Sequence, residues 1–332
     1  MRKKSAEPTI LDVAKIANVS IATVSRALNA KGNVRGDTAA RVFAAMDELG
    51  YQYTPVEERP RNQLIEVVLP NLDNPFYAKI VKGISASAKS RRYDAMIYLC
   101  KDVDRSLHKL LDSLRMINAC GAIILSPVPD YHVLEQIDAV VPLVQCAEYN
   151  EQSALPYVGV DDYAAAKTAV EYLIGQNRRR VALINGPQIY KYARHRYRGY
   201  LDALRDAGLT PDPSYIFHVL EMGFDSALSV ARQLLHYRIP PDAVLAASDI
   251  FASAVVKAAS EEGLEVPREI AVIGFDNTYI SSVSHPSITA VNMPQFQLGY
   301  MACELLAERI LNPAGDHRGS LLNTELVIRE ST

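Results

Sequence analysis

Polar side chains able to bind nucleic acid are concentrated between residues 20 and 29. Ser20, Thr23 and Asn29 can donate hydrogen bonds to phosphate oxygens, and Arg26 is long enough to form two bonds with one guanine edge. Three further residues at helical spacing among them could meet the edges of bases: Ile21, Ala22 and Ser25. These residue types predict contacts with the major groove of double-stranded DNA.

Predicted helices would position these side chains. The spacing of apolar residues predicts helices over residues 10–17, 21–29 and 37–49, with Thr9 as the cap of the first helix. Asn18 tolerates a left-handed backbone, and Ser20 can cap the second helix. Ala14 and Ala17 are small enough to let the first two helices cross closely. The pattern predicts a helix-turn-helix whose second helix reads DNA.

The charge of the chain is divided unevenly along the sequence. Residues 1–41 hold eight Lys and Arg against three Asp and Glu, a balance of +5. The remaining 291 residues hold 27 basic and 35 acidic side chains, a balance of −8. A basic amino-terminal part on an acidic body is typical of a polyanion-binding module joined to a module for another kind of ligand.

The rest of the chain alternates strand-like and helical segments. Residues 53–63 are polar and contain Pro55 and Pro60, which predicts a linker between a DNA-binding domain at 1–52 and a core at 64–332. Strands are predicted over 64–69, 94–99, 121–125, 141–146, 181–185, 243–247 and 270–274. Amphipathic helices are predicted over 77–92, 162–176, 196–207, 225–236 and 250–263. This alternation predicts two α/β lobes with doubly wound parallel sheets, below an all-α head.

Several residue patterns are absent from the sequence, and their absence limits the class of protein. No apolar run approaches the ~20 residues of a membrane span, and no apolar segment follows the basic start as in a signal peptide. The scattered cysteines indicate free thiols in a reducing compartment, and the dispersed histidines have no metal-ligand spacing. We therefore expect a cytoplasmic protein without membrane contact, metal or cofactor.

The helix-turn-helix segment resembles a known family. Residues 8–29, together with Gly50-Tyr51, are similar to the amino-terminal domain of the lactose/galactose repressor (LacI/GalR) family of bacterial transcription regulators. Further motifs follow in family order: Pro70–Phe76, Gly159–Asp162, Arg196–Tyr200, Ala247–Asp249, Val272–Asn277 and Glu325–Arg329. The resemblance implies a core like a periplasmic binding protein, a homodimer, a palindromic operator and a small effector bound between the lobes. No leucine heptads occur at the carboxyl end, so a dimer is the expected assembly.

The resemblance also assigns residues to the effector site. It implies that Phe76 and Tyr77 stack on a ligand ring, that Arg196 clamps hydroxyl or carboxylate groups, and that Asp276 accepts bonds from sugar hydroxyls. Further expected lining residues are Glu148, Asp161, Met222 (or Phe224) and Asp249. Tyr190 and Tyr192 could add stacking surface or only cover a loop. An aromatic floor with one cation and one carboxylate suits a neutral polyhydroxylated ring.

Two departures from the family pattern are visible. The linker lacks the leucine of the usual hinge helix, in which it is similar to the cytidine-repressor branch, and we expect it to specify half-site spacing loosely. Arg35 stands where a serine usually caps the third helix, so we expect Asp37 to take over the cap and Arg35 to contact phosphate. Thr9 and Leu11 complete the candidate DNA-binding residues. The linker favours a nucleoside effector and the family at large a sugar; a sugar is the first expectation.

The sequence disfavours two other classes of protein, an enzyme and a transport-associated binding protein. An enzyme is disfavoured because the sequence contains no Gly-x-Ser-x-Gly elbow, Walker loop or Gly-x-Gly-x-x-Gly fingerprint. A solute-binding protein that feeds a transporter would share the core fold, but it would need an export signal and would have no use for the helix-turn-helix. The sequence therefore predicts a sequence-specific transcriptional regulator, most simply a repressor.

Overall fold

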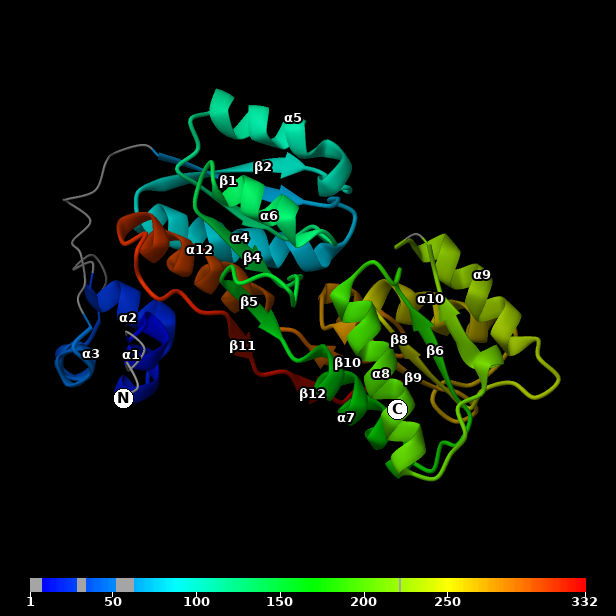
Figure 1. The fold of residues 1–332 in the computed structure, drawn as a ribbon. Coiled ribbons are helices and arrows are strands. Elements are labelled where there is room, and N and C mark those ends of the chain that lie inside the picture. Colours follow the sequence, from blue (N-terminus) through cyan, green and yellow to red (C-terminus); the bar gives the residue numbers. More distant parts are fainter. Residues whose placement is uncertain (1–7, 29–33, 52–62, 221) are drawn as a thin grey trace, which may run out of the picture.

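The computed structural model describes residues 8–28, 34–51, 63–220 and 222–332. It places a small helical head beside two α/β lobes that lie end to end (Figure 1). This is the fold class that the sequence predicts. The linker predicted over 53–63 lies outside the described residues except for Gln63, which is already the first residue of a strand.

The head consists of α1 (Ile10–Ala17), α2 (Ile21–Leu28) and α3 (Gly36–Leu49). Apolar side chains from all three helices form its small core: Ile10, Val13, Ala14, Ala17, Val24, Val42 and Ala45. Asn18 has the left-handed backbone (φ 51°) that lets α1 end and the chain turn into α2. At the start of α1 the Asp12 carboxylate accepts bonds from the backbone N–H and the hydroxyl of Thr9. The predicted helix-turn-helix is therefore present.

The first lobe contains a six-stranded, all-parallel sheet in the order β11-β5-β4-β3-β1-β2. Its strands are β1 (Gln63–Leu69), β2 (Tyr93–Leu99), β3 (Gly121–Ile124), β4 (Leu143–Cys146), β5 (Tyr157–Val160) and β11 (Ser320–Leu322). On one face lie α4 (Pro75–Ser90) and α12 (Gln295–Leu311), and on the other α5 (Val103–Met116) and α6 (Tyr131–Asp138). Neighbouring side chains of β1 point to opposite faces of the sheet, since Val67 packs toward α4 and Val68 toward α5.

The second lobe repeats this design. Its sheet has the order β12-β10-β9-β8-β6-β7, in which only the pairing of β10 with β12 is antiparallel. The strands are β6 (Val181–Asn185), β7 (Ile216–His218), β8 (Ala243–Ala246), β9 (Ala271–Asp276), β10 (Thr289–Asn292) and β12 (Glu325–Val327). The helices are α7 (Asp162–Gly175) and α8 (Lys191–Asp206) on one face, α9 (Phe224–Leu235) and α10 (Asp249–Glu261) on the other, and the short α11 (Tyr279–Val283).

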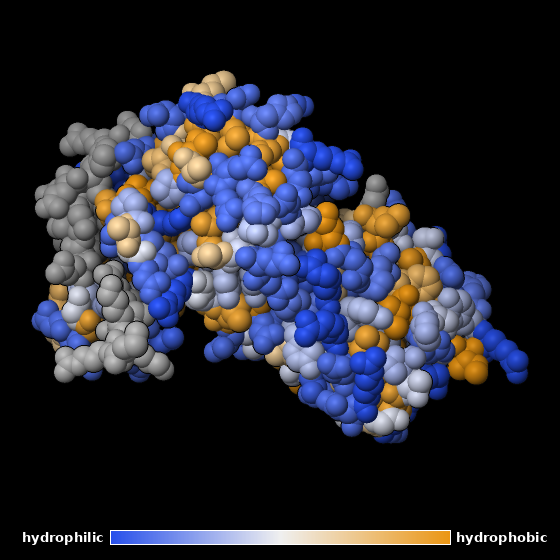
Figure 2. All heavy atoms as spheres, viewed as in Figure 1, coloured by the Kyte–Doolittle hydropathy of each residue, from blue (hydrophilic) through white to orange (hydrophobic). Residues whose placement is uncertain are grey.

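The described chain passes between the lobes three times: after β5, after β10, and between β11 and β12. Each crossing is short, so the facing ends of the two sheets are held close together. The carboxyl ends of β1, β6 and β9 point toward this junction, where ligands bind in open α/β sheets. Figure 2 shows a largely hydrophilic surface over both lobes, with hydrophobic side chains in separate groups. Among the described residues, no helix is both long and apolar enough to span a membrane.

Candidate ligand cleft and nucleic-acid interface

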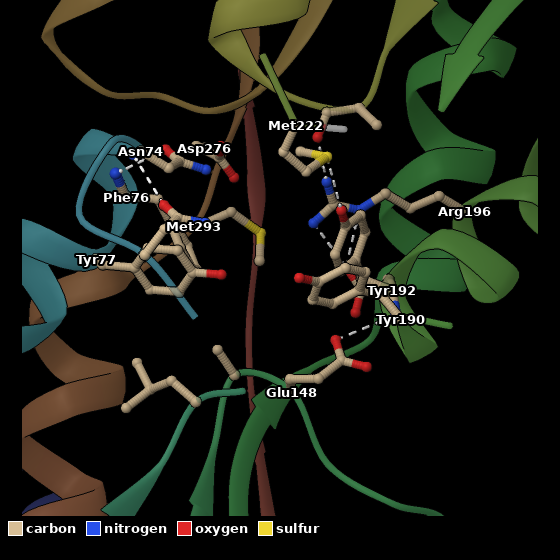
Figure 3. Close-up of a pocket in the computed structure, with 15 residues that line it drawn as sticks. Asn74, Phe76, Tyr77, Glu148, Tyr190, Tyr192, Arg196, Met222, Asp276 and Met293 are labelled. Carbon is tan, nitrogen blue, oxygen red and sulfur yellow. Dashed lines mark hydrogen bonds and ion pairs between the residues drawn. The ribbon is translucent and has the colours of Figure 1, made fainter. Parts of the chain in front are cut away.

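A pocket lies between the lobes and draws its walls from both (Figure 3). From the first lobe come Asn71, Asn74, Phe76, Tyr77, Leu125, Ala147 and Glu148. From the second lobe and the crossing segments come Asp162, Tyr190, Tyr192, Arg196, Met222, Ala247, Asp276 and Met293. Asp162 and Met293 belong to two of the three crossings, so a ligand here would touch the segments that set the angle between the lobes.

Aromatic rings form two opposing sides of the pocket. Asn74 caps α4 by accepting the N–H of Phe76 at 3.0 Å, and this cap aims Phe76 and Tyr77 at the cleft. Their rings meet edge to face, with centroids 5.5 Å apart. On the other side, Tyr190 and Tyr192 have ring centroids 5.1 Å apart at the start of α8 (Figure 3). The two pairs therefore present aromatic surface from both lobes to the same cleft.

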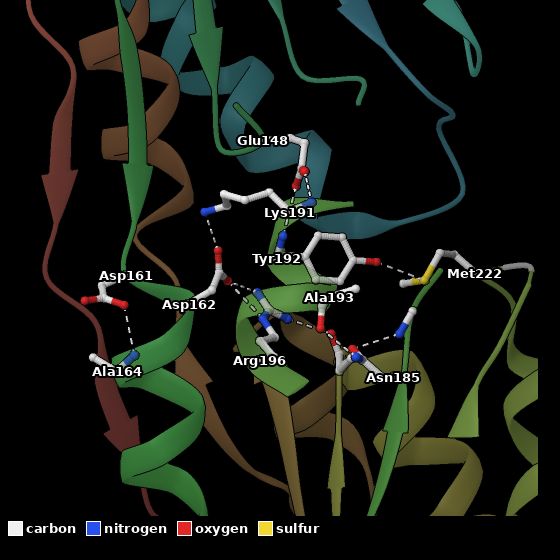
Figure 4. A network of polar contacts seen from close by, with 12 residues as sticks. Glu148, Asp161, Asp162, Ala164, Asn185, Lys191, Tyr192, Ala193, Arg196 and Met222 are labelled. Atoms are coloured by element: carbon white, nitrogen blue, oxygen red, sulfur yellow. Dashed lines mark hydrogen bonds and ion pairs between the residues drawn. The ribbon is translucent and has the colours of Figure 1, made fainter. Parts of the chain in front are cut away.

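Arg196 lines the pocket but is largely engaged by the protein itself (Figure 4). Its Nε and Nη2 lie 2.9 and 2.8 Å from Oδ1 of Asp162, and its Nη1 donates to the carbonyl oxygen of Ala247 at 2.8 Å. Lys191 donates to the other carboxylate oxygen of Asp162 at 2.8 Å. All three charged side chains are buried. Arg196, which was predicted to bind the ligand, therefore also joins α8 to α7 and to the end of β8.

Two carboxyl groups in the pocket have raised pKa values. Burial raises the pKa of Glu148 to about 7, against the lowering effect of Lys191 and of the backbone N–H groups of Lys191 and Tyr192, which donate to it. Burial likewise raises the pKa of Asp276 to about 8, opposed by Arg196 and increased by Asp249. Both groups therefore carry much of their proton at neutral pH, which favours a neutral ligand over a cation.

Asp276 also has a strained backbone. Its φ of 93° is followed by a φ of 54° at Asn277, and L-residues rarely adopt such values. The strained turn ends β9 and directs the Asp276 carboxyl into the cleft (Figure 3), where no described side chain hydrogen-bonds to it. This arrangement leaves the carboxyl group available to a ligand.

The structure brings most of the predicted effector residues together, but not all. Phe76, Tyr77, Glu148, Arg196, Met222 and Asp276 line the pocket. Asp161 does not: it is exposed and caps α7 by accepting the N–H of Ala164, while its neighbour Asp162 points inward (Figure 4). Asp249 is buried beneath the pocket and accepts the Thr278 hydroxyl at 2.8 Å, because the first turn of α10 packs against the loop after β9.

Seven residues that line the pocket were not predicted from the sequence. Asn71 and Asn74 lie in the loop after β1, Leu125 and Ala147 follow β3 and β4, and Ala247 follows β8. The available signal was their common position at or after the carboxyl end of a predicted strand, because the carboxyl ends of parallel strands share one edge of a sheet. Asp162 and Met293 had no such signal, since each depends on a crossing between lobes.

The candidate DNA-binding residues differ in exposure. Ser20, Arg26 and Arg35 are exposed, and five others are partly exposed: Thr9, Leu11, Ile21, Ala22 and Thr23. Ser20 caps α2, with its Oγ 3.1 Å from the N–H of Thr23. Ser25, expected to be free for base contacts, is instead buried, because this face of α2 lies against α12. Asn29 lies outside the described residues.

The start of α3 differs from the prediction. Arg35, and not Asp37, occupies the cap position, and no side chain caps the helix there. Asp37 lies in the first turn, where its carboxylate accepts the N–H of Thr38 at 2.7 Å and complements the positive end of the helix dipole. Arg35 remains exposed at the same end of the helix.

Comparison with known proteins finds matches along the whole chain. Residues 9–53 match the model for bacterial regulatory proteins of the lacI family, and residues 170–332 match the periplasmic binding protein-like domain. The HTH-type transcriptional repressor CytR of Escherichia coli (strain K12) is 33% identical over 338 residues, which cover 100% of this chain and 98% of the relative. The chain belongs to the lacI family. As a member of this family, it is a DNA-binding regulator of transcription.

Solved structures of transcription regulators agree with this arrangement. The complex of the transcriptional regulator CelR with cellobiose superposes with a TM-score of 0.75 and 28% identity, covering 98% of this chain and all of that one. The lac repressor dimer bound to operator and the anti-inducer ONPF superposes with a TM-score of 0.72 and 26% identity, covering 98% of both chains. Head and core together, and not the core alone, therefore have counterparts in known regulators.

Proposed function

We propose that this lacI-family chain is a transcriptional repressor whose affinity for operator DNA changes when a small neutral ligand binds between its lobes. The observation that carries the proposal is the pocket, in which opposed aromatic pairs and the Asp276 carboxyl meet at the crossings between lobes. A ligand there contacts both lobes and the segments that connect them, so it distinguishes between lobe angles. The helical head supplies the DNA contacts, and a DNA partner places the protein in the cytoplasm.

A sugar is the first candidate ligand. Sugars present hydroxyl donors to carboxylates and apolar ring faces to aromatic side chains, and the pocket offers Asp276 together with Phe76 and Tyr77. The similar CelR structure contains cellobiose. A nucleoside is the second candidate, because Tyr190 and Tyr192 face the first aromatic pair and a planar base could lie between them.

The operator contacts follow from the head. Ser20, Thr23 and Asn29 are assigned to phosphates, and Arg26 to a guanine edge. Thr9, Leu11, Ile21, Ala22, Ser25 and Arg35 complete the interface. A homodimer would place two heads on a palindromic site, and the similar lac repressor structure is a dimer on its operator. Exposed apolar side chains on the edge strand β2, Ile97 and Leu99, are candidates for that dimer contact.

A thermal-shift screen of the full chain against sugars, sugar phosphates and nucleosides tests the ligand assignment. Ligand at about 100 times its Kd adds roughly 2.7 kcal/mol of stability, which raises Tm measurably. Asp276→Asn keeps the shape of the side chain but replaces the carboxyl group with an amide, which has neither the O–H donor of the protonated form nor the charge of the ionised form, so it should abolish the shift of any hit. Asp161→Asn is the matched control, because that side chain is exposed and outside the pocket. A hit that survives Asp276→Asn unchanged would contradict the site.

A further inference from the structure

The head does not stand free of the core in this structure. It lies against α12 of the first lobe (Figure 1), and residues of both line the groove between them. Ser25 of α2 and Tyr300 of α12 are only 4% and 6% exposed, and their side chains are hydrogen-bonded to each other. The Tyr51 hydroxyl, just after α3, donates to Oε1 of Glu308 at 2.9 Å. The two parts are therefore joined by specific polar contacts.

Apolar contacts accompany these hydrogen bonds. Leu11 of α1 and Ile21 of α2 pack against the main apolar cluster of the core, to which Met301 of α12 belongs. Phe296 and Gln297, in the first turn of α12, line the same groove from the core side. The contact thus combines burial of apolar side chains with paired polar groups, as protein interfaces do.

The face of α2 that lies toward α12 is the face assigned to DNA. Ile21, Ala22 and Ser25 are the residues that the proposed function places at base edges, and in this structure they lie toward α12 or the groove beside it. A helix that enters the major groove must present this face to the bases. The same face cannot contact α12 and the groove of DNA at once.

We propose that this contact is an autoinhibitory latch, in which α12 and DNA compete for the same face of α2. The latch consists of Leu11, Ile21, Ser25 and Tyr51 on the head and Tyr300 and Glu308 on α12. The inference rests on the proposed DNA-binding role of α2. Its consequence is that weakening the latch increases DNA affinity, although neither Tyr300 nor Glu308 belongs to the DNA-binding surface.

The latch is connected to the ligand cleft through the start of α12. The side-chain amide of Gln295, the first residue of α12, donates to the backbone oxygen of Asp276. Met293, two residues earlier, lines the cleft. A ligand that shifts Asp276 or Met293 acts directly on the end of the helix that holds the head, which gives the cleft a short route to the DNA-binding surface.

Protonation of Glu308 acts on the same contact. The groups that face it are Tyr51 and the N–H of Ile10 from the head, Glu304 from its own helix, and Arg91 beyond α4. Burial raises the pKa of Glu308 to about 7, opposed by the bond from Tyr51. An undocked, exposed glutamate has a pKa near 4.5. The docked state therefore binds the proton more tightly, so docking strengthens as pH falls through about 7 toward 4.5 and is weakest above 7.

DNA affinity of the full-length protein tests the latch. The probe is a labelled 40-base-pair duplex of mixed sequence, and Kd is measured by fluorescence anisotropy at constant salt. Tyr300→Phe removes the hydroxyl that binds Ser25, so we expect DNA to bind several-fold more tightly. Glu308→Gln mimics the protonated form at every pH, so we expect DNA binding at pH 8 to be weaker than that of wild type by about tenfold or more. Matched controls are Tyr131→Phe on α6 and Glu262→Gln after α10, which lie away from the head and should leave Kd unchanged.

The pH profile provides a second readout. From pH 8 to pH 6 the wild-type docking equilibrium should strengthen about tenfold, and DNA affinity should fall with it, beyond any change in the control variants. In Glu308→Gln, DNA affinity should change between pH 8 and pH 6 only as much as it does in the control variants. Equal affinity of wild type, Tyr300→Phe and Glu308→Gln at both pH values would overturn the latch while leaving the repressor proposal intact. No DNA binding by any variant at low salt would instead overturn the proposed DNA-binding role.

Discussion

At the scale of single residues, the protein uses charge in two different ways. The Arg26 and Arg35 side chains are exposed on the head, where they are available to an anionic partner. Arg196 is buried with Asp162 and Lys191, where its charge mainly holds the second lobe together at the cleft. Arginine is therefore available to bind a partner in the head and holds neighbouring elements together in the core. The two uses predict different responses to substitution.

Arg26 and Arg35 should respond differently to removal. Arg26→Ala should cost on the order of 1–3 kcal/mol of operator affinity and relax base preference at one position, because a bidentate guanine contact is lost. Arg35→Ala should weaken binding to all sequences alike and reduce the slope of log K against log salt by about one, as expected for a phosphate contact. Selection of binding sites from a random pool, followed by salt titration, measures both. A uniform loss for Arg26→Ala would make it a phosphate contact instead.

Asp162→Asn should destabilise the core strongly. Burial works to raise the pKa of Asp162, but Lys191 and Arg196 outweigh burial and hold it below its usual value. Because the folded pKa is lowered, this stabilisation is present above the unfolded pKa near 3.8 and is lost as pH falls below it. Removing the charge leaves the buried Lys191 and Arg196 without their shared carboxylate, which costs about 3–5 kcal/mol.

Urea unfolding at pH 7 and at pH 3 measures this effect. The difference between Asp162→Asn and wild type should be large at pH 7 and smaller at pH 3, because below pH 3.8 the carboxyl group is mostly protonated in the unfolded wild type and the folded state loses part of its advantage. Asp161→Asn, one residue earlier and exposed, should change the free energy of unfolding by less than about 1 kcal/mol, the usual size of a helix-cap effect. Similar losses for the two variants would contradict the assigned role of Asp162.

At the scale of elements, the close packing of α4 on α12 determines where the start of α12 lies. A Cβ added to Gly83 would overlap the carbonyl oxygen of Phe296, and one added to Gly299 would overlap that of Ile80. Each helix thus supplies a glycine at the point where the other approaches. The crossing positions both the cleft residue Met293 and the groove beneath the head, so its geometry matters to both sites.

Gly83→Ala should therefore destabilise the first lobe, by about 1–3 kcal/mol or more, because backbone atoms must move apart. Gly175→Ala in α7 is the matched control: nothing lies within 4 Å of its added Cβ, and alanine favours helix by about 1 kcal/mol. Thermal unfolding should show a lower Tm for the first variant and an equal or higher Tm for the second. Equal stability of the two variants would show that the crossing tolerates a wider separation.

The sequence predicted some elements closely and left out others, including the helices α5, α6 and α12 and several short strands. The strand at 181–185 matches β6, and the helices at 162–176 and 225–236 agree with α7 and α9 within a residue. The strands β5, β7, β10, β11 and β12 were not predicted, because three or four residues carry too little periodicity. The predicted helix at 196 begins at Lys191, because its first turn is rich in tyrosine and charge and lacks an apolar stripe.

The site was predictable to the extent that it depends on motifs. Phe76, Arg196 and Asp276 lie within family motifs and reach the cleft as expected. Asp161 and Asp162 are adjacent identical residues, and only the turn that starts α7 decides which one points inward. The burial of Ser25 depends on the contact between head and α12, which is tertiary and leaves no trace in the spacing of residues.

At the scale of the whole molecule, head, linker and core form one linked system. The ligand acts on the crossings between lobes, α12 transmits its position to the head, and the dimer fixes the distance between two heads on a palindrome. The linker predicted over 53–63 joins each head to its core. Its sequence contains no leucine before Leu64 that could wedge into the minor groove at the operator dyad.

We therefore predict loose specification of half-site spacing. Operators whose half-sites are separated by spacers differing by one to three base pairs should bind with Kd values within about tenfold of one another, because the linker sequence offers no leucine wedge that would favour one kinked dyad. Introducing a leucine at Glu58 or at Arg59 supplies a wedge in the linker and should sharpen the preference toward one spacer. Anisotropy titrations with a spacer series measure this. A single sharp optimum for the wild-type chain would show that its linker fixes the geometry of the two heads without a leucine wedge.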